Sequence, residues 1–481
     1  MVNEELIRYP EVDERLKRGK FTDLLAFLGP GLILASASIG SGEVFFSARG
    51  GAIFQYIFLW TFLLGIIMKG VIIYSGTRYI TITGEHPLTR FGEVFPGPKN
   101  WFPTLIGFFA VISFPSWASG FALFLGQWST WVFGFGDQKI WATFWLLVVT
   151  ILAFITMYDI VEKFQTGVVA IMVLFVIIAV FVSHPDWLGV LAGLVPRIPS
   201  GYEPWIIEKY PDIASKRIPL EVITYLGALG GGIYDYFGYL GLYREKKWGL
   251  LGNPNINEIQ ERLLMLKKSE KIPLPEDNNE EIEKAKLWSK APLADAISSF
   301  GSVFILSAVF MILGAVILNP QHLIPTDTKI MQYQVQFFTM ISPILVYLYQ
   351  LGIFCAFFGT MQAVSSQLYV YTLYESFTPL LRNVKWWNIN AAKIIEVLWY
   401  SGGGILLIWT GINFTTAVSF GSLIGGVLGC GIWAIAMMYI DRKMLPKAYQ
   451  MSSALYTAVG ISGFVMTAMG IVGVLQFFHI I

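Results

Sequence analysis

The sequence is poor in charge and almost free of cysteine. Only 14% of its 481 residues are charged, whereas soluble globular proteins carry about 25% charged residues. The 2 cysteines, Cys355 and Cys430, lie inside apolar runs and support neither a disulfide framework nor a zinc site. Apolar residues make up 55% of the chain and aromatic residues 16%. A soluble fold would leave much of that apolar surface in water, so the composition predicts a polytopic membrane protein.

An excess of charge of one sign is also missing, and so are the motifs of an enzyme. The formal net charge is +1, which gives no reason to expect nucleic acid as a partner. The sequence has no nucleophile motif and no phosphate-binding loop after a strand. We therefore expect a protein that is not an enzyme, holds no cofactor, and works in the lipid bilayer on an ion or small solute. The sequence predicts no particular oligomeric state.

Long apolar runs account for most of the chain. A helix needs roughly 20 mostly apolar residues to cross the bilayer, and the runs lack the strict alternation of barrel strands. The fold class predicted is therefore an all-α membrane protein. Eleven runs qualify as spans, which we number in chain order: 24–47, 53–76, 102–125, 140–157, 164–183, 220–243, 294–318, 334–358, 392–410, 414–440 and 452–478.

Basic residues gather in alternate loops, and this bias predicts the orientation. Most of the 33 Lys and Arg residues fall on the side of the membrane that carries the N-terminus, which the positive-inside rule makes cytoplasmic. We expect a plasma-membrane protein with its C-terminus outside. Residues 1–23 are then a cytosolic N-terminal segment before a single transmembrane domain over 24–481. Residues 250–290 form a cytoplasmic connector between the sixth and seventh spans, which we expect to be solvated because it is polar.

Glycine clusters interrupt the first and sixth spans in matching places, and each cluster adjoins a carboxylate in mid-span. An acid at that depth is costly unless it faces a cavity or a partner. Glycines let a membrane helix unwind and expose backbone groups, and transporters with two inverted repeats bind their cargo at such paired breaks. The candidate substrate- or ion-binding residues are Gly40, Ser41, Gly42, Glu43, Tyr234, Asp235 and Tyr236.

A simpler interpretation has to be weighed against this one. Glycines in membrane helices often only permit close packing, which is sufficient for the Gly425-Gly426 pair. Close packing does not explain why a carboxylate, Glu43 or Asp235, adjoins the glycine cluster in each of the two repeats. Lys69 lies within the second span, where it is as well explained by packing support, with its ammonium snorkelling or paired, as by a transport role.

Several segments, in chain order, resemble the Nramp family of divalent-metal transporters. They cover about the first 240 residues and include Leu25-Ala26-Phe27-Leu28-Gly29-Pro30-Gly31-Leu32, Thr77-Arg78, His184-Pro185-Asp186-Trp187 and Leu226-Gly227-Ala228. The resemblance implies a LeuT-like fold, in which a 5+5 inverted repeat is followed by an eleventh helix and helices 1 and 6 are interrupted. It also implies alternating access around a site at the membrane midplane.

The same resemblance shows where the chain departs from the family. The family's site uses Asp-Pro-Gly-Asn in helix 1 and Met-Pro-His in helix 6, and of these only the glycine remains, as Gly42. The aspartate is replaced by Gly40, the asparagine by Glu43, the methionine by Tyr234 and the histidine by Tyr236. The third span contains no Asp or Glu over 105–125, although the family uses acids there to move protons.

These departures change the expected cargo. Glu43 and Asp235 as metal ligands, with backbone carbonyls and the Tyr234 hydroxyl, would form an all-oxygen site. Such a site suits hard ions such as Mg²⁺ or Mn²⁺ and lacks the soft thioether ligand.

The leading hypothesis is a secondary active transporter that carries Mn, Mg or Fe inward. An alternative keeps the fold and carries a small organic cation or amino acid against an aromatic lining. A remote alternative is a membrane receptor or enzyme.

Overall fold

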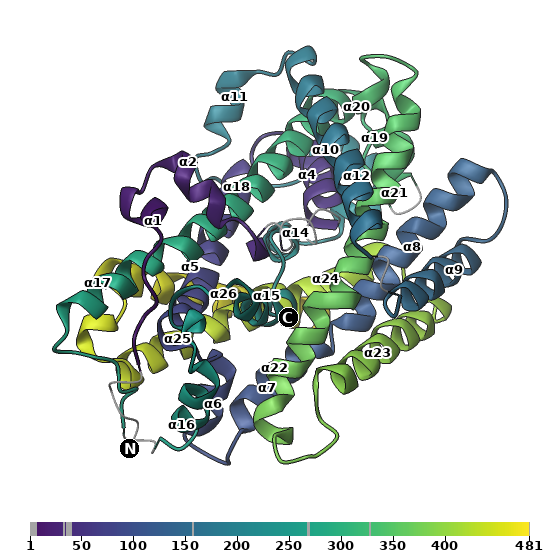
Figure 1. The fold of residues 1–481 in the computed structure, drawn as a ribbon. Helices are drawn as coiled ribbons and strands as arrows, with labels where there is room; N and C mark the ends of the chain where they lie inside the picture. Colours follow the sequence, from purple (N-terminus) through teal and green to yellow (C-terminus); the bar gives the residue numbers. More distant parts are fainter. Residues whose placement is uncertain are drawn as a thin grey trace.

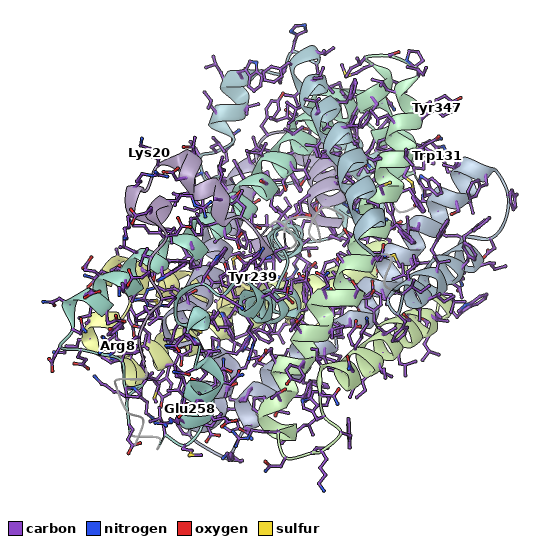
Figure 2. All side chains as sticks on the ribbon, in the orientation of Figure 1. Arg8, Lys20, Trp131, Tyr239, Glu258 and Tyr347 are labelled. Atoms are coloured by element: carbon purple, nitrogen blue, oxygen red, sulfur yellow. The ribbon has the colours of Figure 1, made fainter. Side chains whose placement is uncertain are left out.

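The computed structural model describes residues 7–31, 34, 41–155, 158–266, 270–326 and 329–480. In this part of the chain every regular element is a helix. Figure 1 shows the sixth span, formed by α14 (Ile218–Ala228) and α15 (Ile233–Lys246), in the middle of the bundle. On one flank lie α8 (Phe114–Phe133), α9 (Gln138–Leu152) and α23 (Ile389–Trp409), and on the other α25 (Gly429–Met444) and α26 (Ser453–Phe477). Figure 2 shows Tyr239 near the middle of the bundle, and Arg8, Lys20 and Glu258 toward its margin.

Most of the predicted spans are continuous helices. Seven helical segments of the described residues are long and apolar enough to cross a bilayer, and two shorter apolar helices join them. They are α5 (Leu59–Thr83), α7–α8 (Trp101–Phe133), α9 (Gln138–Leu152), α10 (Tyr158–Val182), α17–α18 with its extension (Asn279–Gln321), α21–α22 (Leu345–Leu381), α23 (Ile389–Trp409), α24–α25 (Phe414–Met444) and α26 (Ser453–Phe477).

The sixth span is not one continuous helix. It consists of α14 (Ile218–Ala228) and α15 (Ile233–Lys246), separated by an unwound segment over 229–232. Gly230 and Gly231 have φ values of 67° and 70°, a left-handed conformation that only glycine adopts without strain. The predicted interruption of the sixth span is therefore confirmed.

The first span is described on either side of its glycine cluster. It begins with α2 (Phe21–Leu24) and η2 (Leu25–Phe27) and resumes with a π-helical turn, η3 (Ser41–Phe46), and α4 (Ser47–Phe54). The predicted interruption at Gly40, and Gly40 itself, lie outside the described residues.

The eighth span starts later than the prediction of 334–358. Two short helices, α19 (Ile330–Gln334) and α20 (Gln336–Thr339), come first, and α21 begins only at Leu345. Pro343 explains the delay, because it has no N–H to donate and restricts the residue before it. The helix then continues to Leu381, past the predicted end, so this predicted boundary was wrong at both ends.

The connector, residues 250–290, buries several apolar side chains although many of its polar ones are exposed, so the expectation of a solvated segment holds only in part. It contains α16 (Ile256–Leu263) and α17 (Asn279–Trp288). Ile259, Leu263 and Ile272 are buried, and the N–H of Ile272 donates to the carbonyl of Met444 at 2.8 Å. The few apolar side chains of the connector therefore cover the ends of membrane helices.

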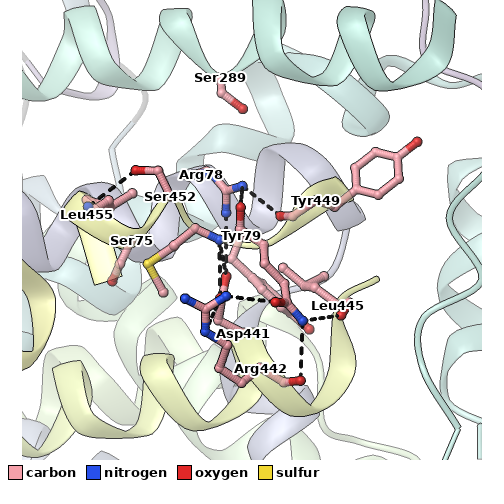
Figure 3. Close-up of polar contacts among 12 residues, drawn as sticks. Ser75, Arg78, Tyr79, Ser289, Asp441, Arg442, Leu445, Tyr449, Ser452 and Leu455 are labelled. Atoms are coloured by element: carbon pink, nitrogen blue, oxygen red, sulfur yellow. Dashed lines mark hydrogen bonds and ion pairs between the residues drawn. The ribbon is translucent and has the colours of Figure 1, made fainter. Parts of the chain in front are cut away.

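An arginine joins the second span to the turn between the tenth and eleventh spans. Arg78, on α5, donates to the carbonyls of Tyr449 at 2.6 Å and Gln450 at 3.0 Å. Its guanidinium also lies 3.6 Å from Asp441 on α25, and Asp441 accepts from the N–H of Met451 at 3.0 Å. Figure 3 shows Arg78 and Asp441 at the centre of this cluster.

We predict that Arg78→Ala destabilises the protein strongly. The side chain of Asp441 is only 2% exposed, so the substitution leaves a buried carboxylate with only the more distant guanidinium of Arg442, 4.0 Å away, at a cost of up to about 3–5 kcal/mol. The measurement is the unfolding temperature of the purified protein in detergent micelles. Lys286→Ala is the matched control, because its ion pair with Glu283 is more than 60% exposed on both sides and should contribute little. Equal unfolding temperatures for the two variants would contradict the prediction.

Candidate functional site

The first span, directly after its glycine cluster, touches the break of the sixth span. Glu43, in the π-helical turn of the first span, is fully buried, and its Oε1 accepts from the N–H of Gly230 at 2.9 Å. A Cβ atom placed on Gly42 would collide with the carbonyl oxygen of Ala228. Glycine at position 42 thus lets the first span touch the unwound backbone of the sixth.

The side chains of Asp235 and Tyr236 both form hydrogen bonds with the same unwound segment. Asp235, in the first turn of α15, is 5% exposed, and its Oδ2 accepts from the N–H of Gly232 at 3.2 Å. The hydroxyl of Tyr236 donates to the carbonyl of Gly230 at 2.8 Å. Asp235 therefore stabilises the start of its own helix, in addition to any role toward a bound ion.

The ring of Tyr234 packs against the third and eighth spans. Its ring centroid lies 5.2 Å from that of Trp117 and 6.2 Å from that of Tyr369. Its hydroxyl is buried and has no hydrogen-bond partner among the residues that the structure describes. Tyr234, one of the residues predicted from the sequence, thus contributes a hydroxyl oxygen and packs with other aromatic rings. The side chain of Ser41 lies outside the described part of the structure.

Lys69 is the residue whose role the sequence did not reveal. It lies on α5, is fully buried, and directs its ammonium into the break of the sixth span. Its Nζ donates to the carbonyls of Gly227 at 2.9 Å, Leu229 at 2.5 Å and Gly231 at 2.6 Å. Only its mid-span position marked Lys69 in the sequence, because no spacing rule relates a residue of the second span to the backbone of the sixth.

The tenth span covers the other side of the break. Its middle is the π-helical segment η8 (Ser422–Leu428). A Cβ atom on Gly426 would collide with the carbonyl oxygen of Gly227, and one on Gly232 would lie 2.7 Å from the carbonyl oxygen of Gly425. The Gly425-Gly426 pair therefore has the packing role expected for it, and its packing partner is the candidate site itself.

An ion pair closes one end of the site. Arg49 on α4 lies 3.3 Å from Glu221 on α14, and both side chains are at most 6% exposed. The pair connects the C-terminal part of the first span to the N-terminal half of the sixth.

A carboxylate on the seventh span holds the other end. Asp295, on α18 (Lys290–Leu313), accepts from the N–H groups of Gly29 at 2.9 Å and Gly31 at 2.8 Å. It also accepts from the hydroxyls of Tyr239 at 2.7 Å and Tyr243 at 3.1 Å. The beginning of the first span and the second half of the sixth are thus held by one buried carboxylate.

The described residues contain no group of three or more His, Cys, Asp or Glu side chains placed to hold a metal ion. Glu43 and Asp235 are the carboxylates that approach the break, and any further ligands would be the Tyr234 hydroxyl, backbone carbonyls and water. Mg²⁺ usually keeps several of its waters in proteins. The donor set therefore fits a partly hydrated hard ion better than a dehydrated soft one.

Comparison with known proteins places the chain in a family. The family model for natural resistance-associated macrophage protein-like (Nramp) proteins matches residues 31–476, which is most of the chain. The chain belongs to the Nramp family. The resemblance drawn from its sequence is confirmed, and as a member of this family it is a multi-pass membrane protein.

Individual relatives are distant from this Nramp family member. The divalent metal cation transporter MntH of Caldanaerobacter subterraneus subsp. tengcongensis is 27% identical over 180 residues, which is 37% of this chain and 42% of that relative. The match thus spans less than half of the relative's length.

Among solved structures, a mutant of the manganese transporter of Eremococcus coleocola has a TM-score of 0.65 and 12% identity, covering 98% of this chain and 89% of that one. The same transporter bound to an aromatic bis-isothiourea compound has a TM-score of 0.63. The predicted fold class, an all-α LeuT-like bundle, is confirmed, with the interruption of the sixth span described and that of the first outside the described residues.

We predict that the contact of Gly42 with the sixth span does not tolerate a methyl group. Gly42→Ala should lower the unfolding temperature and the yield of folded protein, because the new Cβ would overlap backbone of the sixth span that is itself packed against the tenth. Gly402→Ala is the control, since a Cβ there meets nothing within 4 Å. The check is thermal unfolding in micelles, and a Gly42→Ala protein as stable as Gly402→Ala would refute the close approach.

Proposed function

We propose that this Nramp family member is a secondary active transporter that carries a hard divalent cation, Mg²⁺ or Mn²⁺, across the membrane by alternating access. The observation that supports this most directly is the placement of Glu43 and Asp235. Each carboxylate is buried, and each accepts from an N–H of the same unwound segment, at Gly230 and Gly232. Two acids at a helix break in the middle of a membrane bundle are the arrangement expected of an ion site.

The ligand chemistry supports a hard ion. At the two positions where the family has methionine and histidine, this chain has Tyr234 and Tyr236. The Tyr236 hydroxyl already donates to the carbonyl of Gly230. The groups that remain for an ion are carboxylate, phenol and water oxygens, which favour magnesium or manganese over soft metals such as cadmium.

The distribution of basic residues between the two sides of the membrane supports an orientation. We propose a plasma-membrane location with the N-terminus and the connector in the cytoplasm, because most Lys and Arg residues fall on that side. Transport is then inward, from the side of the Arg49–Glu221 pair toward the side of Asp295. The absence of acids over 105–125 supports a transport cycle without the family's proton route in the third span.

We predict that Glu43→Gln and Asp235→Asn each reduce uptake of Mn²⁺ or Mg²⁺ at least about tenfold, because each removes one ionic ligand from a desolvated site. Both variants keep a carbonyl oxygen that can accept from the glycine N–H. The assay is flux into proteoliposomes that contain a divalent-ion indicator. Glu283→Gln, at an exposed side chain of the connector, should transport as the wild type does. Undiminished flux in both acid variants would end the ion-site proposal.

A singly charged organic cation is a second candidate cargo, and Lys69 is the observation that favours it. When Glu43, Asp235 and Lys69 are all ionised, two negative charges and one positive charge leave the site with a net charge of one negative unit. A monocation balances that charge. Trp117 and Tyr369 beside Tyr234 supply faces that attract an ammonium group. Competition separates the two candidates, because excess methylammonium or choline inhibits Mn²⁺ uptake only if the cation site accepts organic ions.

A further inference from the structure

Three carbonyl oxygens converge on the Lys69 ammonium at the break of the sixth span. Gly227, Leu229 and Gly231 place their oxygens 2.5–2.9 Å from Nζ. A lysine ammonium has three N–H donors, so the three carbonyls use all of them without water. Unwound carbonyls of this kind coordinate cations in other membrane transporters, and here the cation is part of the protein.

The same peptide groups connect Lys69 to the two acids. The peptide between residues 229 and 230 accepts from Lys69 through the Leu229 carbonyl and donates to Glu43 through the Gly230 N–H. The peptide between residues 231 and 232 does the same for Lys69 and Asp235. Each carboxylate is thus separated from the ammonium by one peptide group, whose dipole is aligned with both charges. Aligned dipoles of this kind strengthen one another in a low-dielectric interior.

We propose that the break of the sixth span is a monovalent-cation site whose permanent occupant is the Lys69 ammonium. This goes beyond the proposed function, because it concerns an ion that is held rather than carried. The lysine takes the place of an exchangeable cation, balances one of the two carboxylates, and keeps the unwound segment hydrogen-bonded during transport. The stability and the activity of the protein are therefore independent of free Na⁺ and K⁺.

An ordinary helix cap is the main alternative, since lysines often bind the last carbonyls of a helix. Only Gly227 belongs to α14, which ends at Ala228, whereas Leu229 and Gly231 lie in the unwound segment. A cap would also need no acids on the opposite side of the same peptide groups. We call the three carbonyls around the ammonium the cation cage. The two interpretations differ in what this cage should bind when the lysine is removed, because a cation site accepts a free cation and a packing site accepts any group of the right size.

The decisive experiment empties the cage and offers it free ions. Lys69→Ala removes three side-chain carbons and the ammonium nitrogen, which together are n-propylammonium. We expect Lys69→Ala to unfold at least about 5 °C below the wild type in micelles, and 50 mM n-propylammonium to restore more than half of that loss. The neutral isostere 1-propanol should restore none of it. The wild type should respond to neither compound.

A second variant keeps the test valid if Lys69→Ala does not fold. Lys69→Met keeps most of the length of the side chain without its charge, so we expect it to be less stable than the wild type and insensitive to n-propylammonium. A Lys69→Met protein with wild-type stability would overturn the proposal, and so would rescue of Lys69→Ala by 1-propanol as well as by the amine. The wild type itself should unfold at one temperature in sodium, potassium and choline chloride, and stabilisation by Na⁺ over choline would also overturn it.

These measurements are made without any divalent cation or organic cargo. Their outcome therefore does not depend on what the protein transports. Failure of Glu43→Gln and Asp235→Asn to affect uptake would count against the proposed function alone, and a Lys69→Ala protein that is stable without the amine would count against the cation cage alone.

Discussion

The structure depends on how four residues of unwound backbone are satisfied in the middle of a membrane bundle. Peptide groups that leave a helix in the bilayer core find no water, so each needs a partner from the protein. Between residues 229 and 232 the carbonyls go to Lys69 and to the Tyr236 hydroxyl. Two of the N–H groups go to Glu43 and Asp235. The site is therefore first of all the solution to a hydrogen-bonding problem, and its charges are placed by that solution.

The packing around the break follows from the same constraint. Polar side chains can reach unwound backbone only if neighbouring helices approach closely, and small residues make this possible. Gly42 brings the first span against Ala228, and Gly425 and Gly426 bring the tenth span against the residues before and after the break. A change of one methyl group at these positions alters the distance between charged groups as well as the fit of the helices.

The parts that could be predicted from the sequence are those with local signals. Long apolar runs predicted the spans, glycine clusters beside acids predicted that the breaks matter, and a series of short segments predicted the family. The connector was partly misjudged because its buried residues, such as Ile259 and Leu263, are few and are covered by membrane helices far away in the sequence. The late start of the eighth span follows from Pro343, whose effect on a helix boundary is visible only once the apolar run is read residue by residue.

The roles of Lys69, Arg49 and Asp295 could not be predicted, for one shared reason. Each makes its contacts with a different membrane helix, more than 150 residues away in the chain, and a single sequence carries no record of such pairs. Lys69 and Arg49 could be noticed as charges among apolar residues, but their partners are backbone carbonyls and a glutamate that no motif marks. Chemistry that spans two helices has to be read from the fold.

The arrangement around Asp295 has a consequence for the way the protein opens. One carboxylate accepts four hydrogen bonds, two from the backbone of the first span and two from tyrosines of the sixth. Because these bonds share a single acceptor, separating the two spans at this end exposes the carboxylate to water at the moment the backbone bonds are lost, and hydration then favours the separated state. The start of the first span and the second half of the sixth are therefore coupled at this end through one shared acceptor.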